Sequence, residues 1–213
     1  ERRMAERPGW LLSYFQASGL PADELARRAT VLTELASTGT RLGCKAVEPF
    51  VAGALTAGAR RPAEQVWLAH CPGAALAGGL ADPGFDQLGT ERVSPFGWQV
   101  PPSGDVTVEP VGGPGAGRRV QLVNRASVSR LVLVQALALP PGRYRLTAQV
   151  PAGRLTASFA CGPTPPLPHF ISGDPGAAGQ VLDIPACEQL TMGLWLRPTT
   201  DPVALDDVAL VRF

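Results

Sequence analysis

The chain has 213 residues, which is long enough to bury a sizeable core and to hold two domains. Lys and Arg number 19 against 18 for Asp and Glu, and no segment is strongly basic, which excludes the electrostatic footprint of a nucleic-acid-binding protein. No apolar run approaches the roughly 20 residues that span a bilayer, so no membrane span is expected. Because it opens at Glu1 without a Met or a signal peptide, the sequence is interpreted as a fragment.

Residues 1–76 show the apolar spacing of short helices separated by Gly and Pro. One helix is expected around residues 11–15, a second from Pro21, a third over 45–57 and a fourth from Pro62. Short helices joined by short turns predict α-helical hairpins, and the segment resembles the last repeats of a tetratricopeptide-like array. Residues 77–81 are small and featureless, as expected of a linker.

Short alternating apolar runs, separated by turns rich in Pro and Gly, fill the chain from residue 82 to 213. This pattern predicts an antiparallel β-sandwich of about eight strands. The segment 112–117 is expected to be a hairpin loop, since it lacks the Lys and the following helix of a phosphate-binding loop. Within a strand over 131–139, Leu131 and Leu133 are expected to share one face. The last strand changes phase at Asp206 and Asp207, which predicts a β-bulge.

Three motifs of this region carry a family resemblance: Asp82-Pro83-Gly84-Phe85-Asp86 at its start, Trp98 shortly afterwards, and Leu205-Asp206-Asp207-Val208-Ala209-Leu210 in the last strand. Together they resemble carbohydrate-binding modules of the galactose-binding-like jelly-roll type. The resemblance implies a jelly roll with Trp98 in its core, and a structural Ca²⁺ held by Asp86 and Asp207. The family prefers Glu at the position of Asp86, so this ligand is one carbon shorter. A hydrogen-bonding role in a cap or turn is the alternative for these two residues.

The most regular alternation of the chain lies at residues 189–197. Its two faces are Leu190, Met192, Leu194 and Leu196 on one side, and Thr191, Gly193, Trp195 and Arg197 on the other. Trp195 is predicted to stack on a sugar ring, because the apolar face of a pyranose packs on a flat aromatic side chain. The predicted polysaccharide-binding platform comprises Trp195, Arg197, Thr191, Arg143, Arg145 and Gln149. The alternative is that Trp195 is a secondary core residue beneath loops.

Four cysteines allow three disulfide connectivities, of which the pairs Cys44–Cys71 and Cys161–Cys187 within the two regions are the simplest. An even number with wide spacing favours disulfides and an oxidising compartment, either the periplasm or the cell exterior. Four buried free thiols are the alternative. No Cys-x-x-Cys motif is present, which argues against a zinc site.

The sequence predicts an α+β multidomain protein, with helical repeats over 1–76, a linker at 77–81 and a β-sandwich over 82–213. His70 and His169 lack a nucleophile in a recognisable motif nearby and are expected to be solvated or structural, so the chain is not predicted to be an enzyme. A single Lys and abundant Ala, Gly and Pro indicate a GC-rich bacterial genome. Helical repeats followed by such a sandwich are similar to repeat proteins encoded with bacterial exopolysaccharide machinery.

The predicted function is therefore non-catalytic polysaccharide binding in a bacterial cell-envelope protein. A second hypothesis is a protein–protein scaffold, in which the helices bind an envelope partner and the sandwich has no ligand. A third is the accessory end of a larger enzyme.

Overall fold

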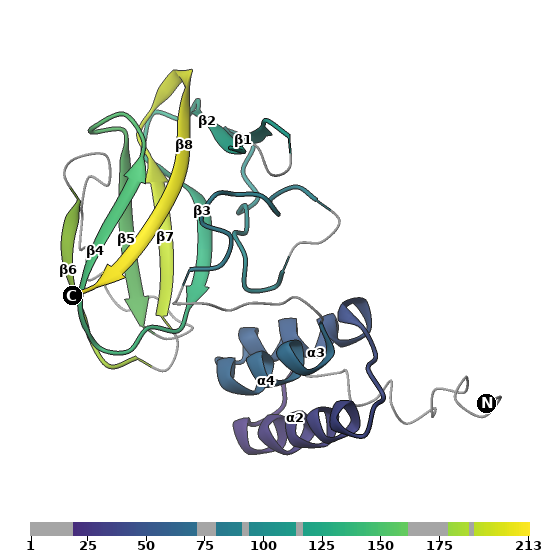
Figure 1. Cartoon of the computed structure of the whole chain (residues 1–213). Helices are drawn as coiled ribbons and strands as arrows, with labels where there is room; N and C mark the ends of the chain where they lie inside the picture. The colour runs from purple at the N-terminus through teal and green to yellow at the C-terminus, as the bar shows by residue number, and fades with distance from the viewer. Residues whose placement is uncertain (1–18, 72–79, 91–93, 114–116, 162–178, 188–189) are drawn as a thin grey trace. The chain divides into compact units, whose positions relative to one another are not determined.

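The structure is a computed structural model that describes residues 19–71, 80–90, 94–113, 117–161, 179–187 and 190–213 (Figure 1). The chain divides into two compact units, residues 1–75 and 76–213. Helices fill the described part of the first unit, and two antiparallel sheets form the second. The predicted fold class, helices followed by a β-sandwich, is confirmed.

In the described part of the first unit, three helices pack together: α2 (Ala22–Ser37), α3 (Cys44–Thr56) and α4 (Arg60–His70), with α4 against both α2 and α3. Each helix buries one apolar stripe, as its sequence spacing predicts. The helix expected at 11–15 and most of the linker at 77–81 lie outside the described residues. The tetratricopeptide-like repeat stays a prediction. None of the described helices has the length and apolar character needed to span a membrane.

His70, at the end of α4, is a structural residue that ties the first unit together. Its side chain is fully buried, with Nε2 2.8 Å from the carbonyl oxygen of Leu32 and Nδ1 3.2 Å from the amide nitrogen of Leu42. The Leu42 N–H must donate to Nδ1, so the ring is neutral and Nε2 carries the proton. Burial lowers the pKa of His70, and the nearby charge of Arg41 lowers it further. The other histidine, His169, lies outside the described residues.

The second unit is a two-layer sandwich. Its strands are β1 (Val106–Val111), β2 (Arg119–Asn124), β3 (Arg130–Leu137), β4 (Gly142–Gln149), β5 (Leu155–Cys161), β6 (Gln180–Ile184), β7 (Leu190–Leu196) and β8 (Thr199–Arg212). One sheet has the order β1-β2-β8-β4-β6 and the other β3-β7-β5, with every pairing antiparallel. Side chains from both sheets form a single apolar core.

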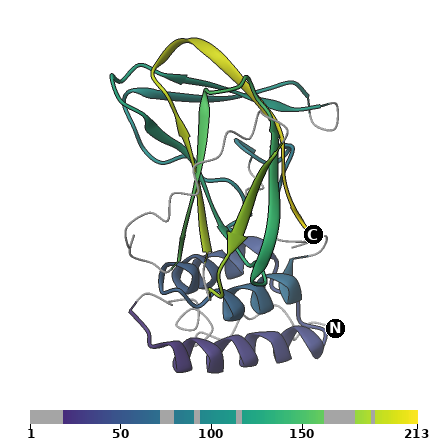
Figure 2. The same ribbon diagram turned by 90° about the vertical axis from the view of Figure 1, so that its left-hand side faces the viewer.

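Strand β8 joins the two halves of the larger sheet, because it pairs first with β2 and then with β4. Figure 2 shows it curving between these two partners on its way to the C-terminus. The register with β4 shifts between Thr147 and Gln149, and Asp207 has a positive φ of 47°. These are the features of a β-bulge, which confirms the bulge predicted at the Asp pair.

The opening motif and Trp98 form part of the sandwich core. Trp98 is 1% exposed, packs on Phe85 with ring centroids 5.6 Å apart, and donates its indole N–H to the carbonyl oxygen of Asp82. The core role predicted for Trp98 is confirmed. Next to this cluster, the buried side-chain amide of Gln135 accepts a hydrogen bond from the backbone N–H of Ala81 and donates one to the carbonyl oxygen of Ala81.

The prediction that Leu131 and Leu133 share one face is wrong. The register of β3 with β7 shifts between these two residues, so that the adjacent Val132 and Leu133 are both fully buried. Leu131 is only partly buried, and its Cδ1 lies 2.8 Å from the point where a side chain on Gly193 would begin. The irregularity in β3 therefore turns Leu131 to the outer face of the smaller sheet.

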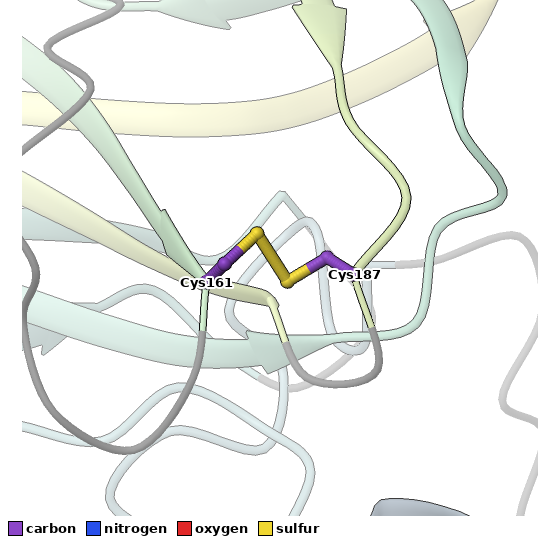
Figure 3. Close-up of a disulfide and its surroundings, with 2 residues drawn as sticks. All are labelled: Cys161 and Cys187. Atoms are coloured by element: carbon purple, nitrogen blue, oxygen red, sulfur yellow. A yellow bond between two sulfur atoms is a disulfide. The ribbon is translucent and has the colours of Figure 1, made fainter.

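The cysteines occur as two close pairs. Cys161, at the end of β5, is bonded to Cys187, which precedes β7 (Figure 3). This confirms one predicted disulfide. Cys44 and Cys71 are thiols in the structure, and their side chains interact directly; burial and this interaction both raise the pKa of Cys71. The disulfide between them stays a prediction that their contact supports.

Candidate functional site

The outer face of the three-stranded sheet carries the only tryptophan that the described strands turn outward. Strand β7 lies in the middle of this sheet, and its inward residues are buried while Thr191 and Trp195 are half-buried. The predicted alternation of β7 is therefore confirmed. The outward positions of the sheet are Leu131, Val134 and Ala136 on β3, Thr191, Gly193 and Trp195 on β7, and Thr156, Ser158 and Ala160 on β5. We call these nine residues the Trp195 face.

Trp195 is fixed in position by its neighbour on β5. The indole N–H donates to the hydroxyl oxygen of Ser158 at 2.8 Å. Gly193 makes this contact possible, because a Cβ at that position would come within 3.0 Å of the Ser158 hydroxyl and 3.4 Å of the indole nitrogen. The absence of a side chain at residue 193 thus lets Leu131, Ser158 and Trp195 converge above the strand.

The chemistry of the Trp195 face suits an uncharged ligand with both apolar and hydroxyl surfaces. The nine residues include an aromatic ring, small and aliphatic side chains, and the hydroxyls of Thr156, Ser158 and Thr191, but no ionisable group. A half-buried indole held by a hydrogen bond offers a preorganised surface for stacking. Arg197, two residues beyond Trp195, is exposed where β7 ends, and its N–H donates to the carbonyl of Arg154.

The structure divides the predicted polysaccharide platform into two. Arg143, Arg145 and Gln149 lie on β4, which belongs to the five-stranded sheet and not to the sheet of Trp195. They are exposed on the outer face of that sheet, and the outer faces of two stacked sheets point in opposite directions. A single surface that joins these three residues to Trp195, Thr191 and Arg197 is therefore ruled out by the sandwich geometry.

On β4, Gln149 and the pair Arg143 and Arg145 have different surroundings. Gln149 donates its side-chain N–H to the carboxylate of Asp207 across the bulge. Arg143 lies 3.7 Å from the carboxylate of Asp183, and the guanidinium groups of Arg143 and Arg145 lie over the ring of Phe213. Only the arginine end of β4 therefore combines exposed charge with an aromatic side chain.

The opening motif and the Asp pair, for which the family resemblance implies Ca²⁺, do lie side by side. The N–H of Val208 donates to the carbonyl oxygen of Pro83. However, Asp207 accepts the hydrogen bond from Gln149, and the backbone oxygen of Asp86 accepts one from Arg118. In the part of the chain that the structure describes, there is no cluster of three or more Asp, Glu, His or Cys side chains that could hold a metal ion. Calcium binding, which takes six to eight oxygen ligands, stays a prediction.

Asp82, and not Asp86, is the most constrained carboxylate of the opening motif. It accepts a hydrogen bond from the N–H of Gln87 and adopts a positive φ of 56°. Burial raises the pKa of Asp82 and the nearby charge of Asp86 adds to this, while backbone hydrogen bonds, led by that of Gln87, oppose the change. This is the turn-capping role of an Asp side chain.

Sequence reasoning missed three residues of these surfaces: Ser158, Gly193 as a packing site, and Phe213. The outward position of Ser158 follows from the alternation of Leu155, Ala157 and Phe159, which are all buried. What the sequence does not reveal is that β5 lies beside β7, since strand pairing depends on contacts distant in the chain.

Comparison with solved structures gives three matching chains, and one of them is a complex of a carbohydrate-binding module. No family model matches the chain, and no curated protein matches it in sequence. Among solved structures, the sandwich is similar to TmCBM61 in complex with β-1,4-galactotriose, with a TM-score of 0.39 and 14% identity, over 63% of this chain and 97% of the other. At this distance, neither identity nor ligand transfers to the present chain.

Proposed function

We propose that the C-terminal unit is a non-catalytic module that binds an uncharged polysaccharide or oligosaccharide on the Trp195 face. The observation that carries this proposal is the half-buried indole of Trp195, held by Ser158 on an outward sheet surface without ionisable groups. A pyranose would stack its C–H face on the indole, and the hydroxyls of Thr156 and Thr191 would bind its hydroxyl groups.

The two sides of the sheet explain why Trp195 is better suited to a ligand than to the core. Every inward residue of β7 is buried against the five-stranded sheet, in a core cluster that does not include the indole. Trp195 points away from this core and is half-buried. An outward aromatic side chain with a fixed orientation is typical of a recognition surface.

The cellular setting is part of the proposal. The disulfide Cys161–Cys187 supports an oxidising compartment outside the cytoplasm, in the periplasm or at the cell surface. The order of helices and sandwich, which is similar to that of proteins encoded with exopolysaccharide machinery, suggests a polysaccharide of the bacterial envelope as ligand. The helical unit would then provide the contact with an envelope protein.

A glycan array tests the proposal with three proteins: the wild type, Trp195→Ala, and Val128→Ala as a control for loss of an exposed apolar side chain elsewhere in the sandwich. We expect the wild type and Val128→Ala to bind the same neutral glycans and Trp195→Ala to lose them, with unchanged circular dichroism. Binding that survives in Trp195→Ala would move the site away from this face. If the wild type binds no glycan, the scaffold hypothesis gains, and pull-downs for a protein partner become the next experiment.

A further inference from the structure

A second exposed surface lies at the arginine end of the five-stranded sheet, where β4 pairs with β6 and with the end of β8 (Figure 1). Its members are Arg143, Arg145, Val181, Asp183, Val211 and Phe213, which we call the Arg145 face. The three apolar members are 38%, 59% and 60% exposed, respectively, and are three of the seven large apolar side chains that the described structure leaves exposed. Such clustering of apolar side chains typically marks a binding surface.

Arg145 is the centre of this surface and is held in place without an acidic partner. In register it pairs with Val181 on β6 and with Val211 on β8. Its Cγ and Cδ lie 2.9 and 3.0 Å from the point where a side chain on Gly179 would begin, so the arginine stem lies across this glycine. Among the residues that the structure describes, no carboxylate forms an ion pair with Arg145.

Arg143 and Phe213 extend the surface. The Cζ atoms of Arg143 and Arg145 lie 5.3 and 5.5 Å from the centroid of the Phe213 ring, within the range of cation–π contacts. Arg143 lies 3.7 Å from Asp183, but both side chains are mostly exposed, so this pair is weak and readily exchanged for another anion. Guanidinium groups that rest on an aromatic ring keep their N–H edges available for a carboxylate.

We propose that the Arg145 face is a second ligand-binding site, specific for a carboxylate-bearing polysaccharide such as one that contains uronic acids. The guanidinium groups of Arg143 and Arg145 complement the carboxylates of such a polymer. The site does not depend on the Trp195 face, because the two lie on opposite sides of the sandwich.

The apolar residues favour a sugar polymer over an acidic protein segment. A chain of carboxylates alone would use the arginines but leave Val181, Val211 and Phe213 exposed. The C–H faces of a uronic acid ring would cover these side chains while its carboxylate accepts hydrogen bonds from Arg145. The surface thus matches the two chemical features that a uronic acid combines in one residue.

The test is a titration of the whole protein with polygalacturonate. Methyl-esterified polygalacturonate serves as the polymer without charge, and poly-L-glutamate as the charged polymer without sugar rings. The variants are Arg145→Gln and Phe213→Ala, with Arg119→Gln as the matched control, since Arg119 is exposed on β2 of the same sheet, away from the part of β8 that pairs with β4. Trp195→Ala is included to keep the two faces distinct.

We expect polygalacturonate to bind the wild type, with affinity about tenfold lower in Arg145→Gln, several-fold lower in Phe213→Ala, and within about twofold of wild type in Arg119→Gln and Trp195→Ala. The ester and poly-L-glutamate should bind at least about tenfold more weakly. Equal losses in Arg145→Gln and Arg119→Gln would overturn the proposal in favour of non-specific attraction. Equal binding of poly-L-glutamate would overturn it in favour of an acidic protein partner, and absence of binding by polygalacturonate would reject the site. None of these outcomes decides whether Trp195 binds a neutral glycan, which the glycan array tests separately.

Discussion

Trp195 on β7 and Ser158 on β5 are joined by a hydrogen bond of 2.8 Å from the indole N–H to the serine hydroxyl. This contact fixes the orientation of the one aromatic ring that the described strands of the smaller sheet turn outward. Its partner oxygen comes from a strand 37 residues earlier in the chain, so the arrangement depends on the pairing of β5 with β7.

Ser158→Ala is expected to weaken glycan binding without removing it. The ring remains but gains rotational freedom, and ordering a side chain on binding costs about 0.5–1.5 kcal/mol, so affinity should fall by roughly two- to tenfold. Stability should fall by about 1 kcal/mol, the net value of one hydrogen bond. Calorimetric titration measures the first effect and denaturant unfolding the second. Ser127→Ala, at an exposed serine of the β2–β3 turn, is the control, and equal affinity of the two variants would contradict an orienting role for Ser158.

The helical unit is expected to lose stability as the pH falls below about 6.5, the ordinary pKa of an unfolded histidine. The folded-state pKa of His70 is lowered, so the unfolded state binds the proton more readily and acid favours unfolding. The stability that neutral His70 contributes is complete above pH 6.5. It is lost as the pH falls from 6.5 to the folded-state pKa of His70. Thermal unfolding of the helical signal between pH 8 and pH 5 measures the effect, and His70→Gln should reduce its pH dependence. A wild-type midpoint that stays constant over this range would contradict the neutral, buried His70.

In oxidising conditions we expect all four cysteines to be paired. The contact of Cys44 and Cys71 places both thiols within reach of one disulfide, and Cys161–Cys187 is already formed. Alkylation of unreduced, unfolded protein, followed by peptide mass spectrometry, should then find no modified cysteine. Label on Cys44 and Cys71 would contradict the second disulfide.

The Cys161–Cys187 bond should contribute about 3.5 kcal/mol to the stability of the sandwich, given the 26-residue separation of its cysteines.

Calcium binding by Asp86 and Asp207 predicts a higher unfolding temperature in millimolar CaCl₂ than in chelator. A ligand at one hundred times its dissociation constant stabilises the folded state by about 2.7 kcal/mol, which is readily seen in the midpoint of a domain this size. Asp86→Asn and Asp207→Asn should each reduce the shift. Identical midpoints with calcium and with chelator would reject the ion and leave Gln149 and Arg118 as the partners of these segments.

Features that depend on local periodicity were predictable from the sequence. The alternation of β7 placed Trp195 outward, and the phase change at Asp206 and Asp207 indicated the bulge. Both follow from residues within a few positions along the chain, where strand geometry has a period of two. The core position of Trp98 was implied by the family resemblance and not by periodicity.

Features that depend on distant contacts were not predictable. The polar side of β4 resembles the outward side of β7 in sequence, but β4 pairs with β6 and β8 in the opposite sheet. The irregularity at Leu131 leaves no mark in the alternation of β3, and it decides which side chain lies beside Trp195. Phe213 joins the arginines only because the end of β8 returns alongside β4.

The central claim, that Trp195 stacks on a neutral sugar, is tested most directly by calorimetric titration of a glycan that the array identifies. The proteins are the wild type, Trp195→Phe and Trp195→Ala. We expect Trp195→Phe to keep binding within about tenfold of the wild type, because a flat ring remains, and Trp195→Ala to lose more than about tenfold, because the stacking surface is gone. An affinity of Trp195→Ala within about twofold of the wild type, with the fold intact, would contradict the claim.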